Sequence, residues 1–317
     1  MESGNSEPIE WAKTFLEDRG CVLQGEFVPV KMASWSSVHR INTSVGAIFL
    51  KEMTPSFAIE ARLLLHLGVV FPEKVPEIVG HNDYLNCFLM FDAGVPLRFC
   101  LSKNYQPHLA EAALTTCATI QQGLIGDVDS LLALGVPDWR LVNLPFLYEE
   151  LLDQRHFLFE DGLTELQLKA LKKYSSRVSI LCKQLGQYAI PETIEHGDFH
   201  DNNCLLYGNE LIIADWGEAL ISHPFFSLLS FLKSTMRNYH IAENNNLRRA
   251  YLKSWKSFES PSRILEAVAL VEQLNPVKFA LSFYNLSQCP GMDESSQYKG
   301  TVAKALQQFL DVHLNYG

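Results

Sequence analysis

The sequence lacks the features that would place this protein in a membrane or in an oxidising compartment. None of its 317 residues belong to an uninterrupted apolar run of the ~20 residues that a membrane-spanning helix needs. A basic and apolar leader is also missing at the beginning, so we expect a cytoplasmic protein. Seven cysteines lie at irregular spacings without a Cys-x-x-Cys pair, which predicts reduced thiols and not a disulfide framework.

Positive charge is scarce as well. The chain has 26 lysines and arginines against 36 acidic residues, which gives a formal net charge of -10. This balance disfavours nucleic acid and anionic membrane surfaces as main partners and is compatible with a cationic small molecule. With 317 residues and 47% hydrophobic content, the chain is long enough for two lobes with a large core.

One stretch stands out, residues 194–217, which read IEHGDFHDNNCLLYGNELIIADWG. Gly208-Asn209 separates two short apolar runs, and this pattern predicts a β-hairpin. Such a hairpin would present Asp198, Asn203 and Asp215 from the same end of a small sheet. Two carboxylates and an amide are ligands that suit a hard cation such as Mg²⁺.

Two other interpretations of this stretch exist. Asp and Asn in loops commonly form turns or cap helices, without further function. Alternatively, His196, Asp198 and His200 alternate along an extended segment and would converge on a transition metal, although the sequence offers no further ligand-rich motif to complete the shell.

The spacing of these residues resembles that of a known family. His196-x-Asp198 followed by Asn203 fits the kinase catalytic-loop pattern H-R-D-x-x-x-x-N, and Asp215-Trp216-Gly217 fits D-F-G with Trp for Phe. The form HGDxHxxN followed by I-x-D-W-G is similar to the aminoglycoside phosphotransferase and choline kinase group. The resemblance implies an α+β, bilobal, protein kinase-like fold. We expect an antiparallel-sheet N-lobe over residues 1–92 and a mainly helical C-lobe over residues 93–317, with a long helix at 165–187.

In this family the motif residues have defined roles. The resemblance implies that Asp198 orients the acceptor hydroxyl and takes its proton, and that His196 fixes the catalytic loop. Asn203 and Asp215 would hold Mg²⁺ on the phosphates of ATP, with GTP as an alternative donor. The family also has a Pro-x-x-Asp-Leu segment whose Asp braces the loop, and this chain has Ser227 at that position.

The N-terminal part supplies a candidate cation for the nucleotide phosphates. Lys51 ends the apolar run 47–51, which resembles the V-A-I-K strand of kinases. Glu60 lies in an otherwise apolar helical stripe, and a carboxylate on a buried face needs a cation. We therefore predict a Lys51–Glu60 ion pair. The alternative is a solvated Lys51 at a strand end, with Glu60 at the margin of the helix.

Two further segments would complete the nucleotide site. The turn before residue 38 has no glycine at its tip, and Ser36 and Ser37 are either phosphate contacts or parts of a plain hairpin turn. Asp92-Ala93 precedes Gly94 at the expected lobe boundary, and by the resemblance its backbone groups would meet the nucleobase.

The acceptor is the least determined part. His200, Glu150 and Glu218 are candidates for lining its site, and the acidic segment around Glu150 suggests a positively charged acceptor. A solvated acidic helix face explains that segment equally well. The expected activity is transfer of phosphate to a hydroxyl of a small molecule, with a metabolic kinase for choline, an amino alcohol or a sugar as the alternative. A second alternative is a catalytically weak nucleotide-binding protein. Sequence patterns do not specify the acceptor or the oligomeric state.

Overall fold

The computed structural model describes residues 7–241, 245–289 and 298–314. The chain divides into two compact units, of which the first comprises Met1–Thr116 and His200–Glu218, and the second comprises Cys117–Phe199 and Ala219–Gly317. The first division between them falls within helix α4 (Pro107–Gly123). The functional boundary expected between residues 92 and 93 stays a prediction.

The first unit is built on a five-stranded antiparallel sheet in the order β1-β2-β3-β5-β4. Its strands are β1 (Val28–Met32), β2 (Ser36–Thr43), β3 (Gly46–Met53), β4 (Ile78–Asn82) and β5 (Cys87–Phe91). Strand β1 is an exposed edge, and its Pro29 and Lys31 flank a bulge that discourages further strand pairing. The expected antiparallel sheet is confirmed.

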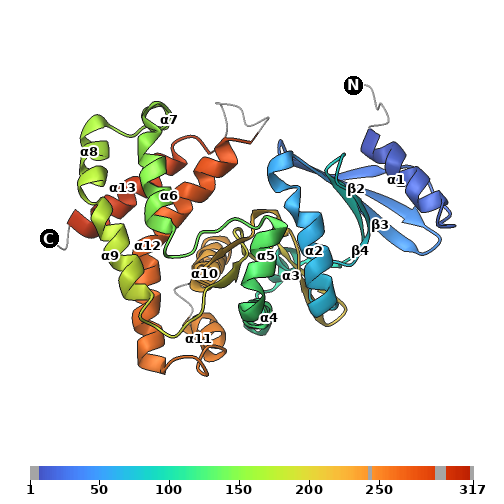
Figure 1. Cartoon of the computed structure of the whole chain (residues 1–317). Coiled ribbons are helices and arrows are strands. Elements are labelled where there is room, and N and C mark those ends of the chain that lie inside the picture. The colour runs from blue at the N-terminus through green and yellow to red at the C-terminus, as the bar shows by residue number, and fades with distance from the viewer. Residues whose placement is uncertain (1–6, 242–244, 290–297, 315–317) are drawn as a thin grey trace. The chain divides into compact units, whose positions relative to one another are not determined.

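Helices α1 (Glu7–Glu17) and α2 (Ile59–Val70) lie on opposite sides of this sheet (Figure 1). Ala12 and Leu16 of α1 pack against Ile48 and Leu50 of β3. Because side chains alternate along a strand, Lys51 projects from the opposite face, toward α2. The alternation thus directs a lysine to the helix that carries Glu60.

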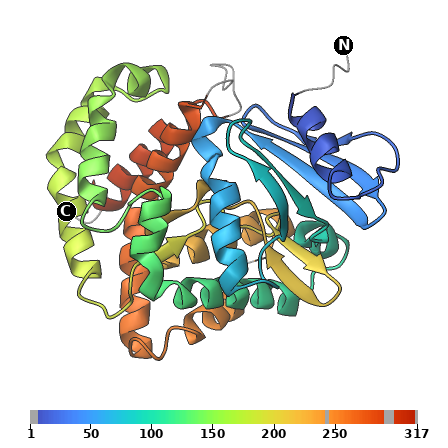
Figure 2. The ribbon, with the colours of Figure 1, turned by 45° about the vertical axis from the view of Figure 1, so that its right-hand side comes forward.

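A second, three-stranded sheet in this unit has the order β6-β8-β9. Strands β8 (Cys204–Tyr207) and β9 (Glu210–Ile213) form the predicted hairpin, coloured yellow in Figure 2, with Tyr207 paired to Glu210. Gly208 in the turn has φ +60°, a conformation that glycine adopts without strain. Gly94 precedes β6 (Val95–Pro96) with φ +100°, and a Cβ there would collide with the carbonyl of Leu206.

The second unit is mainly helical, as expected, with one two-stranded antiparallel sheet formed by β7 (Thr193–Glu195) and β10 (Leu220–Ser222). Its helices are α5 (Val128–Leu134), α6 (Leu144–Asp153), α7 (Arg155–Glu160), α8 (Glu165–Lys173), α9 (Ser175–Leu185), α10 (Phe225–Tyr239), α11 (Asn245–Lys253), α12 (Pro261–Ser287) and α13 (Thr301–Leu314). Helix α12 packs against α6, α9, α10 and α13 and forms the centre of this unit.

The expectation of a single helix over residues 165–187 is wrong, because two helices, α8 and α9, cover this range and are separated at Tyr174. Two serines begin α9, and serine competes with the helical backbone for hydrogen bonds, which favours helix ends over helix interiors. None of the described helices combines the length and the apolar character needed to cross a membrane. No disulfide joins any of the seven cysteines, all of which lie in described residues.

Candidate active site

The hairpin brings two of the predicted site residues together at its open end. Asn203 directly precedes β8 and Asp215 follows β9 by two residues, and the two strands pair there through Cys204 and Ile213. The amide of Ala214 donates a hydrogen bond to the carbonyl of Asn203 (2.9 Å), which closes this end of the ladder. Asn203 and Asp215, twelve positions apart, thus flank one end of the same hairpin.

Lys51 joins this end of the hairpin to the five-stranded sheet. Its ammonium lies 2.6 Å from a carboxylate oxygen of Glu60 and 2.6 Å from Oδ1 of Asp215. The Lys51 and Glu60 side chains are only 8% and 2% exposed, whereas Asp215 is 35% exposed. The predicted Lys51–Glu60 ion pair is therefore confirmed, and both partners are buried.

Glu60 also holds the backbone that follows Asp215. One of its oxygens accepts a hydrogen bond from the Trp216 amide (3.2 Å), and the Trp216 indole donates to the carbonyl of Ile213 (2.8 Å). A Cβ on Gly217 would lie 3.3 Å from both Glu60 and Phe57, so the close approach of this segment to α2 favours glycine there. The carboxylate of Glu60 thus binds the Asp-Trp-Gly segment to α2.

The electrostatics of this cluster follow from burial and charge. Burial by itself lowers the pKa of the Lys51 ammonium, but the carboxylates of Glu60 and Asp215 outweigh it and raise that pKa above its ordinary value. Burial raises the pKa of the Glu60 carboxyl, and the attraction of Lys51 opposes this rise. The cluster therefore keeps Lys51 positively charged at neutral pH.

Asp215 has two unusual features. Its φ is +67°, a left-handed conformation that is uncommon for residues other than glycine but is tolerated by aspartate. Its second carboxylate oxygen lies 3.5 Å from the ammonium of Lys31, which is on the exposed edge strand β1. The sequence did not predict this contact, because nothing near Lys31 in the chain distinguishes it from a solvated strand charge.

The donor atoms at the hairpin end fit a hard cation. Asn203 offers an amide oxygen and Asp215 a carboxylate, and oxygen ligands of these kinds suit Mg²⁺. Among residues 7–241, 245–289 and 298–314, no three His, Cys, Asp or Glu side chains are grouped so as to hold a metal ion. The alternative of a transition-metal site at His196, Asp198 and His200 thus has no support. His196 is instead fully buried, with its ring 5.7 Å from that of Phe199.

Asp201, whose role the sequence did not predict, fixes the segment before the hairpin. Its carboxylate has no exposed surface and is bound by the Arg98 guanidinium, with Nη2–Oδ1 at 2.8 Å and Nε at 3.2 Å from both oxygens. The Arg98 amide also donates to the Asp201 carbonyl (3.0 Å). This two-pronged arrangement restricts geometry more than a single contact does. It also joins α3 (Leu97–Lys103) to the segment that contains His200 and Asn203.

The second unit carries Asp198, which follows β7 by three positions and is half-buried. The residue before it, Gly197, has φ +84°. The amide of His196 donates a hydrogen bond to the hydroxyl of Ser227 on α10 (3.4 Å). Ser227 stands at the position where the resemblance implies an aspartate. Ser227 therefore does contact the loop that carries Asp198.

The predicted phosphate contacts occupy a strand and not a turn. Ser36 and Ser37 are the first residues of β2, paired with Met53 and Glu52, so residues 33–35 form the tip. A hydrogen bond from the Ser37 side chain opposes the rise that burial causes in the pKa of Glu52. The two serines therefore lie at the base of the turn, in the strand that follows it, and their contact with phosphate stays a prediction.

The remaining predicted residues lie as follows. The Asp92 carboxylate accepts a hydrogen bond from the Gly94 amide (2.9 Å), and Ala93 between them is buried. The His200 carbonyl accepts from the Asn203 amide (3.0 Å). Glu150 is exposed on α6, and Glu218 ends the short 3₁₀ helix Trp216–Glu218.

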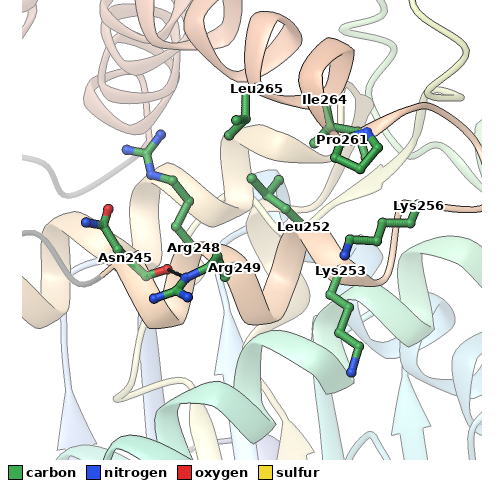
Figure 3. Close-up of a pocket in the computed structure, with 9 residues that line it drawn as sticks. All are labelled: Asn245, Arg248, Arg249, Leu252, Lys253, Lys256, Pro261, Ile264 and Leu265. Atoms are coloured by element: carbon green, nitrogen blue, oxygen red, sulfur yellow. Dashed lines mark hydrogen bonds between the residues drawn. The ribbon is translucent and has the colours of Figure 1, made fainter.

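A pocket of about 580 Å³ in the second unit contains none of the predicted residues. It lies where α11 meets the beginning of α12 (Figure 3). Its lining combines apolar with basic and amide side chains: Leu252, Pro261, Ile264, Leu265, Asn245, Arg248, Arg249, Lys253 and Lys256. Arg248 is held by Glu272 at 2.7 Å, and Lys253 extends away from the leucines (Figure 3).

The sheet, its lysine–glutamate pair and the Asp-bearing hairpin define a phosphotransferase with a protein kinase-like fold. The phosphotransferase enzyme family model matches residues 50–263, and the chain belongs to this family. None of the curated proteins matches the sequence significantly.

Several solved structures share the fold. The gentamicin complex of APH(2")-IIa has a TM-score of 0.65 and 14% identity, covering 98% of this chain and 97% of that one. Choline kinase from Cryptosporidium parvum Iowa II has a TM-score of 0.63 and 12% identity, covering 92% and 89%. Macrolide 2'-phosphotransferase type I has a TM-score of 0.60 and 13% identity, covering 98% and 99%. At these identities the likeness establishes the fold alone.

Proposed function

We propose that this protein transfers the γ-phosphate of a Mg²⁺-bound nucleotide, ATP or GTP, to a hydroxyl group of a small molecule. One observation carries the proposal. The buried Lys51 ammonium is held between Glu60 and Asp215 at the open end of the hairpin. Phosphoryl transfer depends on positioned positive charge far more than on covalent chemistry, and this cluster supplies a fixed cation next to a metal-binding carboxylate.

The residues of the first unit bind the nucleotide in this proposal. Lys51 neutralises phosphate charge, and Glu60 holds it in place from α2. Asn203 and Asp215 are the protein ligands of Mg²⁺, which supplies charge neutralisation on the phosphates when it is bound. The backbone of Asp92 and Ala93 meets the nucleobase. Ser36 and Ser37, the first residues of β2 after the turn, offer their hydroxyl groups to the phosphates in this proposal.

Asp198 is the catalytic residue that orients the acceptor hydroxyl and takes its proton. A positioned base of this kind contributes roughly 10² to 10⁴ in rate. The left-handed backbone at Gly197 turns the chain directly before Asp198, and the buried His196 fixes that turn by packing. His200, Glu150 and Glu218 are acceptor contacts in this proposal.

The acceptor we favour carries positive charge, as an aminoglycoside or an amino alcohol does. The support is the exposed acidic surface of α6, where Glu149 and Glu150 face solvent. Asp153, the third acidic residue of that segment, contributes less because it is paired with Lys172 at 2.6 Å. Solved relatives by fold include a gentamicin complex and a choline kinase, so both acceptor classes are represented among proteins of this shape.

A nucleotide-consumption screen tests the proposal. The purified protein is incubated with Mg·ATP or Mg·GTP and with aminoglycosides, macrolides, amino alcohols and sugars in turn, and Asp198→Asn serves as the blank. We expect acceptor-dependent release of nucleoside diphosphate by the wild type and not by the variant. Tight binding of Mg·ATP without turnover on any acceptor would favour the weak nucleotide-binding protein instead.

A further inference from the structure

A buried ion pair in the second unit lies next to the loop that carries Asp198. Glu195, the last residue of β7, has no exposed side-chain surface, and Lys278 of α12 is 7% exposed. The Lys278 ammonium lies 3.0 Å from Oε2 of Glu195 and donates a hydrogen bond of 3.0 Å to the carbonyl of Gly197. One cation thus ties a strand end to the peptide unit that joins Gly197 to Asp198.

Ser227 of α10 extends this connection to the residue in between. Its hydroxyl donates to Oε1 of Glu195 (2.9 Å) and accepts from the amide of His196 (3.4 Å). Residues 195, 196 and 197 are therefore each held by a side chain from α10 or α12. The next residue is Asp198.

A further layer fixes the direction of the Ser227 hydroxyl. Gln121 Nε2 donates to the Ser227 oxygen (3.3 Å), and the hydroxyl of Tyr251 donates to the Gln121 oxygen. A serine hydroxyl has one proton to donate, and the incoming bond from Gln121 directs that proton to Glu195. All of these side chains are buried, so water does not compete for the bonds.

The chemistry of this network indicates a role in geometry more than in stability. Buried ion pairs add little net stability, because the cost of removing two charges from water offsets their attraction. Apolar side chains of similar size would fill the same space at no greater cost. What they would not supply is the bond from Lys278 to the Gly197 carbonyl or the bond from Ser227 to the His196 amide.

We propose that Glu195 and Lys278 are positioning residues that, together with Ser227, hold the turn at His196 and Gly197 and so set the position of the Asp198 carboxylate. The negative charge that the family resemblance implies at position 227 is supplied here by Glu195. The inference rests on the proposed role of Asp198 as the catalytic base.

The test uses the double variant Glu195→Gln/Lys278→Met, which removes both charges and leaves neither buried alone. Hydrogen–deuterium exchange by mass spectrometry reports on the peptide 194–199 in the full-length protein, and denaturant unfolding reports on global stability. In the variant, local opening of this peptide no longer has to break the bonds of the network. We therefore expect its exchange to become at least about tenfold faster, while the exchange of peptides of α9 and α13 stays unchanged.

Two further variants separate the effect of the Ser227 bond from a general effect of substitutions on α10. Ser227→Ala removes the bond to the His196 amide without introducing a charge, and it should also accelerate exchange in peptide 194–199. Thr235→Val is the matched control, because Thr235 is a buried hydroxyl on the same helix whose bond goes to Leu232 of that helix (2.9 Å). It should leave the exchange of peptide 194–199 as in the wild type.

Turnover supplies the functional readout, with Mg·ATP alone as the probe and water as the phosphate acceptor. The double variant should lose about 10- to 100-fold in kcat, because a small displacement of a catalytic group has an effect of this size, with KM for Mg·ATP within about twofold. Unchanged exchange in peptide 194–199, or equal acceleration in every peptide, would overturn the positioning role. A wild type that consumes no Mg·ATP with water or with any acceptor of the screen would instead refute the proposed function, and the exchange result would stand separately.

Discussion

The ammonium of Lys51 and the carboxylate of Asp215 lie 2.6 Å apart, although 164 positions separate them in the sequence. Asp215 reaches this contact from the end of a hairpin strand, and Lys51 from the inner part of a sheet strand. Glu60 holds the same ammonium from its other side. Because a lysine between two carboxylates stays charged and in place, this pair fixes a cation at the open end of the hairpin.

The first prediction concerns Glu60. Glu60→Gln keeps the size of the side chain and removes the charge that fixes Lys51, so kcat/KM for Mg·ATP should fall by about 10²-fold or more, as when one preorganised donor is lost. Steady-state kinetics measure the effect, and circular dichroism checks the fold. Glu52→Gln, a half-buried carboxylate on the same strand as Lys51, is the control. Wild-type kinetics in Glu60→Gln would show that the pair has no role in turnover.

The second prediction separates binding from chemistry. Asp198→Asn should reduce kcat by roughly 10² to 10⁴ and leave the Kd for Mg·ATP within a few fold, because its carboxylate acts on the acceptor. Asp215→Asn should weaken nucleotide binding only when Mg²⁺ is present. Asparagine is chosen at position 215 because it tolerates the left-handed backbone there. Steady-state kinetics measure kcat, and titration calorimetry with and without Mg²⁺ measures the nucleotide affinity of both variants. Equal losses of affinity in the two variants would contradict the assigned roles.

The third prediction concerns Lys31, whose exposed ammonium lies 3.5 Å from Asp215. Lys31→Met should raise KM for Mg·ATP by about two- to fivefold, the range of an exposed charge contact, and the difference should shrink at high salt. Lys74→Met is the matched control, because Lys74 forms an exposed ion pair with Glu210, beside the turn of the same hairpin (2.8 Å). A change of equal size in both variants would mean that the effect is one of general surface charge.

The fourth prediction concerns the pH dependence of stability. His223 is fully buried and accepts a hydrogen bond from the Phe225 amide, and burial lowers the pKa of this histidine to about 3. The unfolded chain, with an ordinary pKa of 6.5, therefore binds a proton that the folded protein does not. Below about pH 6.5 the free energy of unfolding should fall by up to ~1.4 kcal/mol per pH unit from this residue.

Denaturant unfolding between pH 5 and pH 8 measures this slope. His223→Asn preserves an acceptor for the Phe225 amide and removes the titrating group, so its acid slope should be smaller than that of the wild type. His156→Asn is the control, because His156 is 86% exposed. If the free energy of unfolding falls with pH equally steeply in the wild type and in His223→Asn, the assignment of the acid sensitivity to His223 is refuted.

The fifth prediction concerns the acceptor. If the acceptor is cationic, its KM should rise between low and moderate salt, because attraction to exposed carboxylates is screened over about 8 Å at physiological ionic strength. Glu150→Gln should raise this KM further, whereas Glu160→Gln, an exposed carboxylate on α7, should not. Efficient turnover of a neutral sugar, with a KM that changes neither with salt concentration nor in Glu150→Gln, would exclude a cationic acceptor.

Local chemistry of the sequence was sufficient for much of this protein. Gly208-Asn209 between two apolar runs specifies the hairpin, because its backbone suits a tight turn and the runs pair at once. The helical stripe that includes Glu60 predicts its burial, and a buried carboxylate requires a cation, which led to Lys51. The spacing of His196, Asp198, Asn203 and Asp215 led to the phosphotransferase family.

Other contacts were decided only by the tertiary structure. Lys31 meets Asp215, Arg98 meets Asp201, and Lys278 meets Glu195, each across more than 80 positions and without a periodic pattern. The start of β2 at Ser36 was also decided by pairing with Met53, because hydrogen bonds between strands, and not turn composition, determine where a turn ends. Periodicity reports which face of an element is buried, whereas the partner on that face depends on how distant segments pack.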